Sequence, residues 1–296
     1  MTNKKSVWLW LLASLLTIAV AVYQRVSGPT YPVRGKETLA GAEVQYKFYR
    51  SWTSGQELPV RITISHGIDG AWLYYCRYPL LAGENWTKTQ LEKKAGALLG
   101  FIPSQPPAGK VIYRLEVSAA GQNYWLNGNR PTLARFKGHV PAVLLIVHIL
   151  FMLAGLLLAL RTGLEALRRD GPTGPRRGGP TGPCRGGRWQ KMVPWTLAVV
   201  CAGGLLLGPL VQKYAFGAFW TGFPLGHDLT DSKTLLAVVS WLAAFFLRKK
   251  SRCWTLAATG IMLAVYLVPH SILGSEFNYQ TGKVETAAGI RSPSIK

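Results

Sequence analysis

The chain has few charged residues, and acidic ones are the scarcest. Only 16% of its 296 residues are charged, with 13 Asp and Glu against 34 Lys and Arg. Soluble proteins carry about 25% charged residues, so the shortfall favours a membrane protein. The net charge of +21 is typical of nucleic-acid binding, but much of the excess lies beside apolar runs, where it sets membrane orientation. We therefore expect membrane lipids, and no nucleic acid, as the partners of these basic residues.

Cysteine and the common catalytic motifs are scarce or lacking as well. Among the four cysteines, only Cys76 lies between the first and second apolar runs, so no disulfide is expected to cross-link that region. There is no Cys-x-x-Cys pair, no phosphate-binding glycine loop and no Gly-x-Ser-x-Gly motif. The sequence therefore identifies neither a catalytic residue nor a cofactor, and it favours a non-enzymatic role.

Long apolar runs are what the chain does have. A helix needs about 20 apolar residues to cross a bilayer, with roughly 17 as the lower limit. The fourth run is short and can span if Lys233 and Arg248 reach the two interfaces. The first run ends near Ala19-Val20-Ala21, so it is either an anchor or a cleaved signal peptide. The sequence thus predicts five transmembrane helices, at 7–23, 140–160, 193–211, 234–247 and 254–273.

Basic residues beside these runs predict the orientation. Lys4 and Lys5 precede the first run, and further Lys and Arg fill the segments 161–192 and 248–252. Because Lys and Arg favour the cytoplasmic side, we predict the N-terminus and both segments inside. Residues 24–139 and the C-terminal tail, 275–296, are then outside. The segment 161–192 contains a tandem octapeptide rich in Pro, Gly and Arg, and we expect a disordered basic linker there.

Residues 24–139 are predicted to form an exported all-β domain. Apolar and polar residues alternate along several stretches, as at Val60 to Ile64, which is typical of strands with one buried face. About seven strands in about 100 residues indicate an immunoglobulin- or fibronectin-III-like sandwich. Thr87 to Gln90 match a helix capping box, and apolar residues follow to Leu99, so one short helix is expected there. We expect the aromatic residues mainly in the core, with a carbohydrate- or peptide-binding face as the alternative.

Three histidines are the candidate cofactor-binding residues. In the predicted topology His148 lies within the second span, while His227 and His270 lie near the outer membrane face. An ionisable group within a span is a functional hypothesis by default, and imidazole binds metals and haem. Interhelical hydrogen bonding and interface anchoring are the alternatives. Asp228 and Asp231 are expected to cap the fourth helix, and the aromatic loop 216–223 to anchor at the interface or face a substrate.

Several short segments resemble an uncharacterised family of bacterial multi-pass membrane proteins with an N-terminal anchor and an exported β-sandwich. They are 105–110, 135–141, 229–234 and 269–276. The resemblance implies a bacterial inner-membrane location and no known activity.

The sequence thus predicts a membrane α-helical bundle plus an all-β domain. Its expected function is an interaction, scaffold or sensor protein of the cell envelope, whose exported domain binds a partner that is another envelope protein. One alternative is a membrane redox or metal/haem-binding protein that uses His148 with His270 or His227. Another is a transporter or channel subunit.

Overall fold

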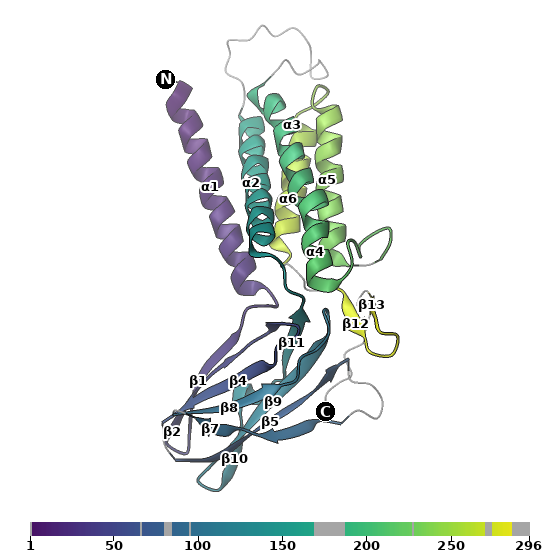
Figure 1. Cartoon of the computed structure of the whole chain (residues 1–296). Helices are drawn as coiled ribbons and strands as arrows, with labels where there is room; N and C mark the ends of the chain where they lie inside the picture. The colour runs from purple at the N-terminus through teal and green to yellow at the C-terminus, as the bar shows by residue number, and fades with distance from the viewer. Residues whose placement is uncertain are drawn as a thin grey trace. The chain divides into compact units, whose positions relative to one another are not determined.

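A computed structural model describes residues 2–65, 67–79, 85–94, 96–168, 187–226, 228–269 and 274–285. The chain divides into two compact units, each described by itself (Figure 1). The helical unit comprises Met1–Gly28, Val140–Lys213 and Ala218–Gly274. The β unit comprises Pro29–His139, Tyr214–Gly217 and Ser275–Lys296. The octapeptide repeat expected to be disordered lies outside the described residues, except for its last glycine.

The β unit contains two large sheets, which are antiparallel except for the parallel pair of β3 and β11, and a small two-stranded sheet. The five-stranded sheet has the order β1 (Val33–Leu39), β2 (Ala42–Phe48), β4 (Leu58–Ile64), β8 (Ala97–Ile102) and β7 (Glu92–Lys94). The six-stranded sheet has the order β3 (Ser51–Thr53), β11 (Thr132–Lys137), β9 (Lys110–Ala119), β5 (Ile68–Tyr78) and β6 (Thr87–Gln90), and β10 (Gln122–Trp125) pairs with β9. A short 3-10 turn, η1 (Leu126–Asn129), follows β10, and β12 (Glu276–Asn278) pairs with β13 (Lys283–Glu285).

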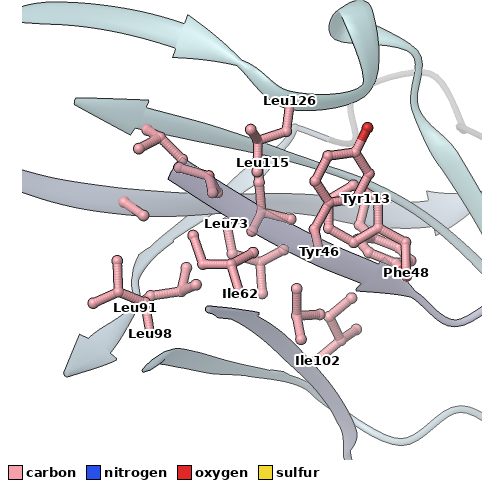
Figure 2. Packing of buried hydrophobic residues seen from close by; sticks show 14 of the residues in the cluster. Tyr46, Phe48, Ile62, Leu73, Leu91, Leu98, Ile102, Tyr113, Leu115 and Leu126 are labelled. Carbon is pink, nitrogen blue, oxygen red and sulfur yellow. The ribbon is translucent and has the colours of Figure 1, made fainter. Parts of the chain in front are cut away.

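The two sheets enclose one apolar core, to which alternate residues of the longer strands contribute (Figure 2). Along β4, Leu58, Val60 and Ile62 are buried while Arg61 is exposed, which is the alternation that the sequence predicts. Tyr113 of β9 lies in this core and donates its hydroxyl to the carbonyl oxygen of Tyr49 at 2.8 Å. Burial raises the pKa of this phenol well above its usual value. The hydrogen bond satisfies the one polar atom that the ring brings into the core.

The helix expected from the capping box is wrong. Residues 87–90 and 92–94 form the strands β6 and β7, and β8 follows from Ala97. The chain passes from the six-stranded sheet to the five-stranded sheet at this point, with Leu91 buried between them. Gly96, at φ +73°, makes the turn from β7 to β8. Leu91, between β6 and β7, and Leu98 of β8 matched a helical period, and both are buried because they lie in the core of the β unit.

The helical unit contains α1 (Thr2–Ser27), α2 (Ala142–Leu167), α3 (Arg188–Cys201), α4 (Gly208–Phe216), α5 (Leu229–Leu247) and α6 (Cys253–Leu267). A π-helical segment, η2 (Ala202–Leu207), joins α3 to α4. In the described part of the chain, four helical segments are long and apolar enough to cross a membrane: Ser6–Ser27, Ala142–Leu167, Arg188–Phe216 and Leu229–Leu247. The expectation of five is therefore wrong by this measure, because α6 is a shorter apolar helix of 15 residues.

The first helix packs into the helical unit. Ala13 and Val20 belong to the same buried cluster as Leu156 and Trp241. At one end of α1, Ser6 Oγ accepts a hydrogen bond from Arg161 of α2 at 3.3 Å. Near its other end, Gln24 donates to the carbonyl oxygen of Tyr266. These contacts lie along the length of α1, and the choice between an anchor and a cleaved signal peptide stays a prediction.

The second helix runs beyond its expected end at residue 160. Arg161, expected in the basic linker, lies on α2 and is buried. Its guanidinium Nη1 lies 2.6 Å from Oε2 of Glu165 one turn later, and both side chains are almost completely enclosed. The ring of Trp10 from α1 lies 5.4 Å from the guanidinium carbon. The helical unit therefore contains a buried ion pair where the sequence suggested a solvated charge.

Candidate functional site

Of the three histidines named as cofactor ligands, the structure describes one. His227 and His270 lie outside the described residues, so the proposed meeting of these imidazoles stays a prediction. His148 lies on α2 and is half-buried. Among the described residues there is no group of three His, Cys, Asp or Glu side chains that could hold a metal ion.

His148 contacts the π-helical segment. Its Nδ1 lies 3.0 Å from the carbonyl oxygen of Gly203, which also accepts the backbone N–H of Gly208. A carbonyl oxygen only accepts, so Nδ1 must carry the proton in this contact. In the neutral ring, Nε2 is then left with its lone pair. π-helical segments within α-helices are frequent at functional sites, and an ionisable residue such as His148, in a helix long and apolar enough to cross a membrane, favours a functional site as well.

Two glycines allow the π-helical segment to approach its neighbours. A Cβ at Gly203 would lie 3.1 Å from Met152 Sδ of α2, and a Cβ at Gly204 would lie 2.6 Å from Thr234 of α5. A side chain at Gly204 would therefore require the methyl group of Thr234 to move. In the sequence, this close approach is indicated by the pair Gly203-Gly204 inside an apolar run. The sequence does not show that His148 lies beside this pair.

The loop before α5 folds around a buried carboxylate. Asp231 Oδ2 accepts from the backbone N–H groups of Thr221 and Gly222, at 2.7 and 3.1 Å. Asp228 caps α5, as the sequence predicts, by accepting from the N–H of Thr230 at 2.7 Å. Asp231, also expected to be a cap, instead fixes the aromatic loop. Lys233 donates to the carbonyl oxygen of Val268 at 2.9 Å and so ties α5 to the end of α6.

In the β unit, residues 275–279 are bound to the strands, and we call this the tail clasp. Glu276 forms an ion pair with Lys110 at the start of β9, and both side chains are largely buried. The backbone N–H of Phe277 donates to the carbonyl oxygen of Ala108 at 3.1 Å. Tyr279 donates its hydroxyl to Gln105 Oε1 at 2.9 Å. Two of the segments that carry the family resemblance, 105–110 and 269–276, therefore meet in the clasp.

The clasp has further support around the ion pair. Arg135 of β11 donates to the carbonyl oxygen of Ser275, and its guanidinium lies over the ring of Phe216 at 3.9 Å. The guanidinium of Arg77 lies over the ring of Tyr279 at 5.0 Å. Burial, and after it the charge of Glu276, raise the pKa of the Tyr78 phenol. The tail is thus held by charge, main-chain and aromatic contacts together.

Rings and cations alternate on the outer side of the six-stranded sheet. The Lys88 ammonium lies 5.2 Å from the ring centroids of both Trp72 and Tyr74. The Arg114 guanidinium lies 4.3 Å from the centroid of Trp125 and 4.8 Å from that of Trp86. We call this surface the aromatic face, and it comprises Trp72, Tyr74, Trp86, Lys88, Arg114 and Trp125.

Polar contacts hold the aromatic face in one arrangement. Tyr74 donates its hydroxyl to Glu116 Oε2 at 2.7 Å, and Arg114 donates to Asn129 Oδ1 at 3.1 Å. The interaction with the Tyr74 hydroxyl raises the pKa of Lys88, which stays positively charged at neutral pH. The expectation that aromatic residues fill the core holds for Phe48, Tyr113 and Phe136. It does not hold for the aromatic face. On β5, Leu73 points into the core, so Trp72 and Tyr74 on either side of it lie outside the core.

Comparisons with known proteins assign no family. No family model and no curated protein matches the chain. Among solved structures, one titled "Crystal structure of Br derivative BhCBM56" is similar at a TM-score of 0.25 and 7% identity. The match covers 34% of this chain and 97% of the other. At this TM-score the similarity identifies neither the fold nor a ligand.

Proposed function

We propose that this protein is a multi-pass protein of the bacterial inner membrane whose β unit, an immunoglobulin- or fibronectin-III-like sandwich, is exported and binds a partner. The aromatic face carries this proposal. Trp, Tyr and Arg are the residues most enriched at binding hot spots, and here they lie together outside the core. The apolar helices and the basic residues of the intervening segments support a membrane anchor with this orientation.

Site-specific photocrosslinking in cells tests the partner. Gln90 of β6 and Gln45 of β2 are both exposed glutamines, on opposite sheets of the β unit. A photoreactive amino acid at position 90 is expected to give a discrete adduct with another envelope protein, because this position pairs with Trp72 at the aromatic face. At position 45 no such adduct is expected. Equal adducts at both positions, or no adduct at position 90, would contradict the proposal. An adduct at position 90 that persists in the variant Trp125→Ala would contradict it as well.

A second candidate is a redox or metal/haem-binding role for the helical unit. One observation favours it: His148 donates its Nδ1 proton to a backbone carbonyl and keeps Nε2 as a lone-pair donor. Histidines that bind metals usually donate their other ring N–H to a carbonyl or a carboxylate in this way. The described residues contain no group of three His, Cys, Asp or Glu side chains that could hold a metal ion, so a site with three such ligands would need residues outside them.

Absorption spectra and metal analysis of the purified protein test the second candidate. If it holds, His148→Ala abolishes a haem absorption band or a stoichiometric metal content. His139→Ala is the matched control, because His139 is exposed and lies outside the predicted spans. A wild-type protein with neither haem nor metal would rule this role out, and so would equal retention in both variants.

A further inference from the structure

We propose that the partner presents an extended acidic segment that pairs with the edge strand β6, so that its carboxylates contact Lys88 and Arg114 of the aromatic face. This inference rests on the proposed function and specifies the chemistry of its partner. Three observations support it. Strand β6 is an edge strand, the surface beside it is positively charged, and cations already lie over the rings of the aromatic face.

Strand β6 lies at one end of the six-stranded sheet. It pairs with β5 on one side, and in the described part of the chain no strand pairs with its other side. All four residues of β6, Thr87 to Gln90, are exposed. An exposed edge presents unpaired N–H and C=O groups and serves as a template for an added strand. After β6 the chain passes to the five-stranded sheet, where β7 is the edge strand and its three residues are also exposed.

The charge of this edge selects an acidic strand. Lys88 lies on β6, and Lys93 and Lys94 follow on β7 at the edge of the five-stranded sheet, with Glu92 as the one acidic residue between them. Arg114 lies on β9, two strands in from β6 and beyond Tyr74 of β5, and its guanidinium lies 4.8 Å from the ring centroid of Trp86, which precedes β6. Between positions 29 and 139 there are 14 Lys and Arg and seven Asp and Glu. Edge lysines commonly protect proteins against edge-to-edge aggregation, and the same charges favour an acidic strand over a neutral or basic one.

The occupied rings argue for a peptide and against a sugar. A sugar that stacks on an aromatic residue needs an open ring face. Here Lys88 covers faces of Trp72 and Tyr74, and Arg114 covers faces of Trp86 and Trp125. The cations remain the groups that an incoming ligand meets. Carboxylates spaced two residues apart on an extended segment match the way side chains of one face recur along a strand.

Binding of a synthetic peptide to the full chain in nanodiscs of neutral lipid tests the inference. The probe is a labelled peptide of alternating Glu and Val, and its affinity is measured by fluorescence anisotropy. We expect saturable binding that weakens as salt is raised. The double variant K88E/R114E is expected to weaken binding about tenfold or more, because two attractive contacts become repulsive. K47E/R61E is the control with the same charge change on the five-stranded sheet, and it is expected to bind like the wild type.

Three further probes separate the alternatives. The same peptide with alternate backbone nitrogens methylated is expected to lose binding, because it cannot complete a ladder. Equal binding of the methylated peptide, or an equal loss in K47E/R61E, would overturn strand addition. Binding of alginate or of anionic vesicles in place of the peptide would overturn the choice of a protein partner. If photocrosslinking at position 90 succeeds while the acidic peptide fails, the proposed function stands and this inference does not.

Discussion

A cysteine at position 280 is expected to react with a membrane-impermeant maleimide from the same side of the membrane as a cysteine at position 123. Position 280 lies in the turn between β12 and β13, and position 123 lies in β10. The tail clasp requires this result, because Glu276 and Lys110 form an ion pair only within one compartment. Three helical segments long and apolar enough to cross a membrane (α2, α3 through α4, and α5) and the shorter apolar helix α6 separate the two positions. If all four cross, the chain returns to the side from which it left.

This expectation depends on α6, which has 15 residues and a length of about 22 Å. The hydrocarbon core of a bilayer is about 30 Å thick, so α6 spans only with local thinning or with polar flanks that reach the interfaces. The native cysteines are first replaced, and Lys249→Cys serves as the opposite-side control because it lies between α5 and α6. Intact cells are expected to label Asn123→Cys and Gln280→Cys but not Lys249→Cys. Labelling of position 280 together with position 249 would show that α6 does not cross and that the clasp does not form.

The change Glu165→Ala is expected to lower the free energy of unfolding by about 3–5 kcal/mol. Arg161 Nη1 lies 2.6 Å from Glu165 Oε2, and the Arg161 side chain is only 3% exposed. Without the carboxylate, a buried guanidinium keeps only the hydroxyl of Ser6 and the ring of Trp10 as partners among the described residues. Unfolding in mixed micelles of a mild detergent and sodium dodecyl sulfate, followed by tryptophan fluorescence, measures the loss.

The double variant R161M/E165L separates the buried charge from packing. It removes both charges and keeps side chains of similar length, and such replacements are often neutral or stabilising. We therefore expect it to recover most of the stability that Glu165→Ala loses. A double variant as unstable as the single one would mean that the pair is required for its geometry and not only for neutralisation.

The sequence predicts that the β unit is built of strands, but it does not predict every strand or which strands pair. Alternation along β2, β4 and β9 identifies strands because each buries one face in a shared core. The segment 87–99 misleads because a capping motif and a helical period coincide there by chance. Strand pairing outweighs these local signals: β6 pairs with β5, and β8 pairs with β4. No local feature of the sequence carries that information, since the partners lie at a distance along the chain.

The candidate sites also differ in how far the sequence predicts them. The cap at Asp228 depends on residues within one helical turn, and the sequence predicts it correctly. The ion pair Arg161–Glu165 has helical spacing, but the linker was expected to begin at residue 161 and the pair was not identified. The clasp joins Lys110 to Glu276, and the aromatic face joins β5, β6, β9 and β10. Contacts of this kind depend on the tertiary fold, and a single sequence offers only candidates for them.

The tail clasp also sets an order for biosynthesis. The strands that contain Lys110 and Arg135 emerge from the ribosome long before Glu276, yet these strands hold the tail in the finished protein. The β unit therefore stays incomplete until the chain has been made through α6 and as far as the clasp. A nascent chain that stalls before residue 276 leaves Lys110 without the carboxylate of Glu276 in the domain that is made first.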